Sequence, residues 1–168
     1  MAYAEKPKGC VGCPAYKWGK GFVPPNGEPD APAAFVGQGP GQTEGWTSEP
    51  FHDTAPIGQR FNKWLATSGI VRREVLVGNL VQCWLPKFYK GSAPDGNRDP
   101  TRKEMWWCWN AHVGPWLTGL GADVVVVPVG IPAAKFILSI PEDEGAEKFL
   151  GTLNNVDLPE VGKNNEQD

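Results

Sequence analysis

The sequence predicts an α/β protein with a three-layer α/β/α sandwich around a small parallel sheet. Apolar runs of strand length at residues 33–36, 75–80 and 123–129 alternate with segments whose apolar residues follow a helical period. The first run leads directly into a glycine-rich loop, which is typical of a ligand-facing strand end in α/β folds. The third run is apolar on both faces, as an interior strand of a parallel sheet is. Right-handed crossovers between the strands then place helices on the faces of the sheet.

An irregular N-terminal arm precedes the first strand. The first thirty residues are rich in Pro, Gly and Lys and show no sustained period, so we expect an arm that is anchored at Cys10 and Cys13. The strand at residues 33–36 runs into residues 37–41, where three glycines allow close approach of the backbone. A ligand-facing loop is therefore expected at the end of the first strand.

The first helix is predicted over residues 58–68. Phe61, Trp64 and Leu65 lie at helical spacing there, and Gly69 provides a stop signal. The second strand, residues 75–80, then completes the first strand–helix–strand unit.

Two more helices flank the third strand. After a polar loop at residues 87–100, a capping box of Thr101 and Glu104 begins a helix that we expect to continue to about residue 117. After the strand at residues 123–129, Pro132 near the first turn begins another helix. The longer of these helices carries a group of tryptophans that we expect to pack around the core, namely Trp106, Trp107, Trp109 and Trp116.

The length of 168 residues allows one domain, which we place at residues 1–150. The acidic tail at residues 151–168 has little to bury and is expected to be flexible, although residues 156–158 could add a short edge strand. No apolar run approaches the roughly 20 residues of a membrane helix, and the N-terminus lacks the apolar core of a signal peptide. We therefore expect a soluble, cytoplasmic protein without membrane contact.

The net charge of −3 hides an uneven distribution. Residues 60–103 contain nine Lys or Arg against three Asp or Glu, whereas residues 142–168 contain two Lys against eight acidic residues. A basic middle segment suits phosphate contacts, because each neutralised phosphate releases counterions. It is equally compatible with a solvated face, so charge alone does not decide the partner.

The four cysteines, Cys10, Cys13, Cys83 and Cys108, form one close pair and two distant singles. In a reducing compartment a domain of this size does not need disulfides, so metal ligation is favoured. Structural zinc sites usually combine two close pairs, which this spacing lacks. Spacing therefore leaves zinc and a [4Fe-4S] cluster as comparable alternatives.

Six motifs follow one another in the chain: Cys-x-x-Cys, Gly-Gln-Gly-Pro-Gly-x-x-Glu, Glu-Pro-Phe, Gly-Asn-Leu-Val-Gln-Cys, Asn-Arg-Asp-Pro-Thr-x-x-Glu with a following Cys, and Gly-Ile-Pro-Ala-Ala-Lys. In order and spacing, residues 10–138 resemble the iron–sulfur (family 4) uracil-DNA glycosylases. The resemblance implies the fold of that superfamily, a [4Fe-4S] cluster on the four cysteines, and single-stranded or uracil-containing DNA as the partner. It also implies excision of uracil, or a related base, by hydrolysis of the N-glycosidic bond in base-excision repair.

The same resemblance assigns a base pocket. Asn79 matches the amide that reads the uracil edge, because an amide supplies a donor for O4 and an acceptor for N3–H. Phe51 matches the aromatic residue on which the flipped base stacks, although burial in the core would also account for it. Backbone N–H groups of the loop that contains Gly37, Gln38 and Gly39 would face the base and the flanking phosphate.

DNA contacts are expected from the basic segment. Arg98 and Lys103 are candidates for backbone phosphates. Residues 87–96 form a longer link than the family usually has, and Lys87 and Lys90 lie in it together with two aromatic residues that could stack on single-stranded DNA. An irregular surface loop would fit this stretch as well.

Two departures from the family bear on catalysis. Family members carry Glu where this chain has Gln38, which cannot ionise to activate water. The family's C-terminal His-Pro-Ser-like motif, whose His stabilises the departing base, has no counterpart, and a protein partner could supply it. Asp53 and His52, and after them Glu44, are the candidates for compensation, with exposed loop residues as the alternative.

Three functions therefore remain open. We favour a DNA glycosylase, with Gln38, Asp53 and His52 as its tentative catalytic residues. The alternative is a catalytically weak or inactive DNA-binding module that retains the base pocket and the cluster. A zinc-bound structural protein outside nucleic-acid metabolism is the third.

Overall fold

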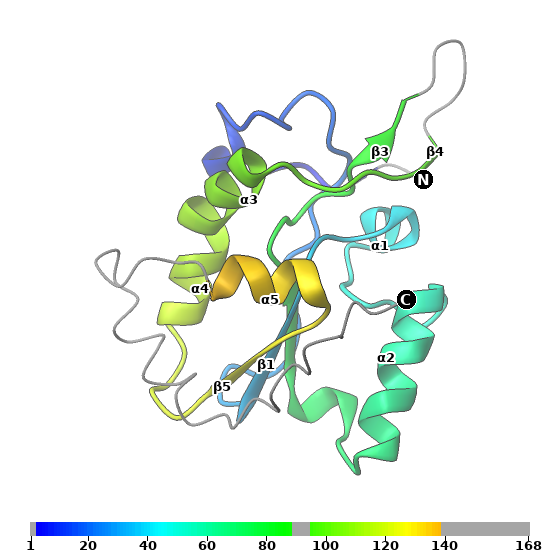
Figure 1. The fold of residues 1–168 in the computed structure, drawn as a ribbon, viewed down its shortest axis with the longest axis vertical. Helices are drawn as coiled ribbons and strands as arrows, with labels where there is room; N and C mark the ends of the chain where they lie inside the picture. The colour runs from blue at the N-terminus through cyan, green and yellow to red at the C-terminus, as the bar shows by residue number, and fades with distance from the viewer. Residues whose placement is uncertain (1–2, 89–94, 139–168) are drawn as a thin grey trace, which may run out of the picture.

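The computed structural model describes residues 3–88 and 95–138. Its main sheet has three parallel strands in the order β2 (Leu76–Asn79), β1 (Ala33–Gly37) and β5 (Val125–Pro128), with β1 in the centre (Figure 1). Val36 and Leu76, on adjacent strands, are both buried. The predicted small parallel sheet is therefore confirmed, with each strand within two residues of its expected bounds.

Helices cover both faces of this sheet. Ala34 and Val36 of β1 pack into a cluster with Val113, Leu117 of α4 (Gly114–Thr118) and residues of α5 (Ile131–Ile137). The intervening Phe35 packs instead against a second cluster that contains two residues of α2 (Pro56–Thr67). Alternate residues of one strand thus point to opposite faces, as the strand period requires. The expected layering of helix, sheet and helix follows from this alternation.

The predicted helix over residues 101–117 is not continuous. It begins at the expected capping box, in which Thr101 and Glu104 satisfy each other's backbone N–H groups, and α3 spans Arg102–Cys108. A π-helical turn at Trp109–Val113 then separates α3 from α4. Pro115 lacks the N–H that would continue the α-helical pattern through this point, which accounts for the interruption.

Tryptophans on this helical segment pack inward, as expected. The rings of Trp106 and Trp109 lie 5.1 and 5.9 Å from the ring of Phe136 in α5, measured between centroids. Trp116 packs against the same buried cluster. Trp107 instead reaches the N-terminal arm, where its Nε1 donates to the carbonyl of Gly9 at 3.1 Å.

Some elements have no counterpart in the sequence prediction. A short helix, α1 (Gln42–Thr47), follows the glycine-rich loop, and β3 (Pro86–Lys87) pairs with β4 (Asp95–Asn97) as an antiparallel hairpin. Residues 89–94 and 139–168 lie outside the described part of the chain. Lys90, the acidic tail and the possible edge strand at residues 156–158 therefore cannot be placed.

The N-terminal arm lies against the body of the domain through backbone hydrogen bonds as well as through side chains. Lys20 and Trp84 exchange two backbone hydrogen bonds of 2.8 and 3.0 Å, and the Val23 N–H donates to the Gln82 carbonyl at 2.8 Å. Figure 1 shows the arm beside α3. Within residues 3–88 and 95–138, no helix has the length and apolar character needed to cross a membrane.

Candidate functional site

The predicted base pocket falls at the carboxyl edge of the parallel sheet. Gly37 and Asn79 end neighbouring strands and are register partners. A Cβ atom on Gly37 would stand 2.5 Å from Oδ1 of Asn79 and 2.8 Å from Cζ of Phe51, so these three residues meet at one point. The sequence analysis assigned all three to base binding. The structure brings them together, while their role in binding stays a prediction.

Asn79 carries an unmatched polar group in this pocket. Its side chain is only 1% exposed, and its Nδ2 has no hydrogen-bond partner among the described residues. Burying an amide donor without a partner costs on the order of 1 to 3 kcal/mol, and such groups are rare in folded proteins. A ligand that offers an acceptor at this point would remove the cost.

Phe51 forms the aromatic wall of the pocket. Its backbone lies in the left-handed region, with φ of 53°, which is costly for an aromatic residue. Its ring is buried and lies 4.6 Å from the ring of Phe61 between centroids. Phe51 therefore belongs to the second core cluster, and stacking of a base on its ring stays a prediction.

Glu44 fixes the Phe51 backbone in this conformation. This buried carboxylate accepts the N–H of Phe51 at 2.6 Å with one oxygen and the N–H of Gly41 at 2.5 Å with the other. Burial raises the pKa of Glu44, and the two backbone N–H groups oppose that shift. These bonds give Glu44 a positioning role, and a role as a base stays a prediction.

The glycine-rich loop has fewer available donors than its sequence suggests. Pro40 has no N–H, and the N–H of Gly41 donates to Glu44. The carbonyls of Gly37 and Gln38 accept from Leu80 and Val81, at 2.8 and 3.1 Å, and these bonds hold the loop against the end of β2. The N–H groups of Gln38 and Gly39 are therefore the donors that the loop can direct toward a ligand.

His52 and Asp53 lie on the loop that follows Phe51. The Asp53 side chain is 76% exposed, and its carboxylate lies 3.3 Å from Nδ1 of His52. The same nitrogen lies 2.9 Å from the hydroxyl of Thr54. These contacts form a polar surface group next to the pocket, and a catalytic role for either residue stays a prediction.

All four cysteines line a second pocket, between the arm and α3. Within the described part of the chain, no group of three or more His, Cys, Asp or Glu is arranged to hold a single metal ion. Which metal these cysteines hold, zinc or a [4Fe-4S] cluster, therefore stays a prediction.

The environment of this cysteine pocket disfavours free thiolates. Burial raises the pKa of Cys83 to about 12 and that of Cys108 to about 12. The neighbouring cysteines raise both values further, because several thiolates in one pocket repel each other. Thiolates would persist here only when bound to a positive centre, and such binding stays a prediction.

Several N–H groups point at the sulfurs. The backbone N–H groups of Ala15 and Gln82 donate to Cys13 Sγ at 3.4 Å and to Cys108 Sγ at 3.3 Å. Nε2 of His112, from the π-helical turn, lies 3.2 Å from Cys10 Sγ. No motif in the sequence predicts His112 at this site.

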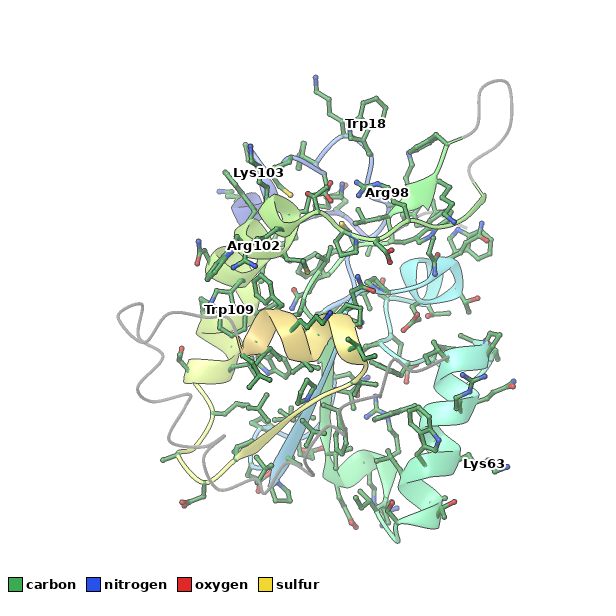
Figure 2. The ribbon with its side chains drawn as sticks, viewed as in Figure 1. Trp18, Lys63, Arg98, Arg102, Lys103 and Trp109 are labelled. Atoms are coloured by element: carbon green, nitrogen blue, oxygen red, sulfur yellow. The ribbon has the colours of Figure 1, made fainter. Side chains whose placement is uncertain are left out.

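The candidate DNA-contacting residues differ in the ion pairs and the exposure of their side chains. Arg98 forms a two-bond ion pair with Glu104, at 2.6 and 2.8 Å, beside the cysteine pocket. Lys87 and Lys103 are exposed. Figure 2 places Arg98 and Lys103 at the end of the molecule that carries Trp18, whereas Lys63 extends from α2 at the other end. Phosphate contacts by these residues stay a prediction, and for Arg98 a structural role is already evident.

The amino-acid sequence matches a known family and several known proteins. The profile of the Uracil DNA glycosylase superfamily matches residues 24–163. A Type-4 uracil-DNA glycosylase from Thermotoga maritima is 34% identical over 135 residues, which cover 80% of this chain and 64% of that protein. One from Archaeoglobus fulgidus is 32% identical over 131 residues, covering 78% of this chain and 59% of that protein. The chain thus spans less than two thirds of the length of these relatives.

Proposed function

Because the chain belongs to the uracil DNA glycosylase superfamily, we propose that it binds uracil-containing DNA and removes the base in base-excision repair. The observation that carries this proposal is the buried Asn79 amide, whose Nδ2 lacks a partner among the described residues, in the pocket bounded by Gly37 and Phe51. A base that has been flipped out of the helix would enter this pocket.

The amide of Asn79 suits uracil by its hydrogen-bonding pattern. Nδ2 would donate to O4 of the base, and Oδ1 would accept from N3–H. Cytosine presents an amino donor in place of O4 and an acceptor at N3, so it would face the amide with like groups. Uracil would therefore bind more tightly than cytosine, because cytosine would leave buried polar groups of the pocket unpaired.

Hydrolysis breaks the bond from N1 of uracil to C1′ of the sugar, and water supplies the new oxygen on C1′. Negative charge then develops on the departing base, and the N–H groups of Gln38 and Gly39 would stabilise it. Gln38 itself cannot accept the proton of the water. His52 and Asp53 are the proposed acceptors, because they lie next to Phe51 and their side chains reach the surface.

We also propose that Cys10, Cys13, Cys83 and Cys108 hold a [4Fe-4S] cluster, with zinc as the alternative. The cluster would supply structural cross-linking between the arm and α3, and no step of hydrolysis passes through it. Iron and acid-labile sulfide at about four atoms each per chain would support it. Anaerobically purified protein that contains zinc and no iron would exclude it.

The test of activity uses a single-stranded oligonucleotide with one uracil. Excision leaves an abasic site that alkali cleaves, and the product is quantified on a gel. The expected result is cleavage by the wild-type protein that falls by at least about 100-fold in Asn79→Ala, because a preorganised hydrogen bond is lost. Equal traces of product from both proteins would reject the glycosylase.

A second candidate function is a DNA-binding module without hydrolysis, which Gln38 favours because an amide cannot activate water. The variant Gln38→Glu separates the two. If wild-type protein binds the oligonucleotide without excising uracil and Gln38→Glu excises it, the natural protein is a DNA-binding module without hydrolysis. If wild-type protein cleaves and Gln38→Glu adds little, water is activated elsewhere and the enzyme proposal stands.

A further inference from the structure

Two half-exposed aromatic side chains meet on the surface of the protein, although 70 positions separate them in the sequence. Trp18 of the arm is 55% exposed and Phe88, at the end of β3, is 49% exposed. Their ring centroids lie 5.8 Å apart at an interplanar angle of 66°. Neither ring belongs to the two buried clusters, so the pair is not explained by core packing.

The arm holds Trp18 in place. Nζ of Lys6 donates to the carbonyls of Tyr16 and Gly19, at 2.5 and 2.7 Å, on both sides of Trp18. The paired backbone bonds between Lys20 and Trp84 attach the same loop to the segment that leads into β3. The loop that carries Trp18 is therefore held in place and attached to the segment that leads to Phe88.

The surroundings of the pair are cationic. Residues 6–20 contain four lysines and no acidic residue, and Lys87 immediately precedes Phe88. Lys17 and Lys87 are exposed. Figure 2 shows Trp18 at the same end of the molecule as Arg98 and Lys103. Aromatic rings set among positive charges match a polyanion whose bases can stack.

The β3–β4 hairpin also connects the aromatic pair with the base pocket. Nε1 of Trp84 donates to Oδ1 of Asn97 in β4 at 2.8 Å. Nδ2 of Asn97 lies 3.5 Å from the position that a Cβ on Gly41 would take, so the hairpin borders the glycine-rich loop. A DNA strand that extends from the base pocket across this loop would contact the hairpin next.

We propose that Trp18 and Phe88 form a stacking surface for unpaired bases of the DNA strand that flanks the excised nucleotide. This inference rests on the proposed function and adds a preference for single-stranded DNA. Stacking on aromatic residues within a cationic groove accepts any base, because every base has a π-face. In duplex DNA the neighbouring bases are paired and stacked, so this surface would contribute little.

The experiment measures binding of a fluorescently labelled, uracil-free single strand by anisotropy. Trp18→Ala and Phe88→Ala should each weaken binding by at least about fivefold, in keeping with the loss of one stacked base. Trp18→Phe should retain most of the affinity. Trp64→Ala is the matched control, because Trp64 is 51% exposed and follows Lys63 on α2, at the other end of the molecule.

Unchanged affinity in Trp18→Ala and Phe88→Ala, with the melting temperature of the wild type, would overturn the proposal. An equal loss in Trp64→Ala would also overturn it. Because the strand lacks uracil, this result is independent of excision. If the wild-type protein does not excise uracil but both variants bind the strand more weakly, the stacking surface is supported and the glycosylase proposal is rejected. In an active protein the same variants should raise KM and leave kcat unchanged.

Discussion

Gly37 determines whether the base pocket has room for a ligand. A side chain at this position would overlap Asn79 Oδ1 and the Phe51 ring, at 2.5 and 2.8 Å. We therefore expect Gly37→Ala to lower uracil excision by at least about 100-fold, because the Asn79 hydrogen bonds are displaced. Gly39→Ala is the control, since its nearest neighbours lie 3.8 Å away. The alkali-cleavage assay on both variants tests this, and equal rates would contradict it.

His112 is expected to influence the proposed cluster through one hydrogen bond. Its Nε2 lies 3.2 Å from Cys10 Sγ, and N–H donors to ligating sulfurs raise the reduction potential of a cluster. His112→Phe should therefore lower the midpoint potential in a dye-mediated redox titration, while iron content stays the same. His112→Gln, which keeps an N–H donor, should recover part of the shift. Identical potentials in all three proteins would show that the contact has no such effect.

At the scale of single residues, the resemblance and simple chemistry identified Asn79, Phe51 and Gly37, which the structure places together. Glu44 was considered only as a possible base. Its actual contact, the N–H of Phe51 seven positions further on, requires the intervening chain to turn back, and no local pattern encodes that turn. The Arg98–Glu104 pair was missed for a similar reason, since each residue had a separate local interpretation.

Among the elements, α3 depends on Glu104 for two sets of contacts. Glu104 completes the capping box with Thr101 and pairs with Arg98. Burial alone would raise the pKa of Glu104, but the bonds from Arg98 and Thr101 outweigh it and lower the pKa below the ordinary 4.5. Stability from this carboxylate is thus present above pH 4.5 and is lost as the pH falls through the lowered pKa.

Glu104→Gln should accordingly lower the free energy of unfolding by about 2 kcal/mol at neutral pH, the worth of a charge-assisted hydrogen bond. The difference from wild type should shrink as the pH falls below 4.5. Urea unfolding across this range measures both effects, with the exposed Glu28→Gln as the control. A difference that is independent of pH would assign the loss to packing instead of charge.

The sheet and its main helices were predictable because their periods are local. The strand at residues 123–129 and the helix around Phe61 and Leu65 were recognised from apolar spacing alone. The π-helical turn was not, because Trp109–Val113 has an ordinary helical composition and its geometry follows from Pro115 and from packing. The contact of Trp18 with Phe88 joins two segments whose pairing only the tertiary structure determines.

For the whole molecule, the proposed cluster would join the arm to the domain. Other links include the backbone bonds of Lys20, Val23 and Asn26, and the bond from Trp107 to Gly9, and most of them lie beyond residue 19. Removal of iron by anaerobic chelation should therefore make residues 3–20 sensitive to a protease while the parallel sheet stays resistant. Mass spectrometry of the fragments identifies the cut sites.

Cys13→Ser provides the matched variant for this experiment, and it should resemble the iron-depleted protein. If both proteins are cleaved first within α2 or the sheet, the cysteine pocket supports the core instead of the arm. If neither is cleaved faster than wild type, the hydrogen bonds of the arm are sufficient without any metal.

Glu44 has one more consequence. Its two oxygens hold the glycine-rich loop on one side and the Phe51 backbone on the other, so the opposing walls cannot separate unless one of these bonds breaks. We therefore expect the spacing between the loop and Phe51 to be set before any nucleotide arrives. A purine has a second fused ring, so its entry would require one of these hydrogen bonds to break. We therefore expect discrimination by base size before the Asn79 amide forms hydrogen bonds to the base.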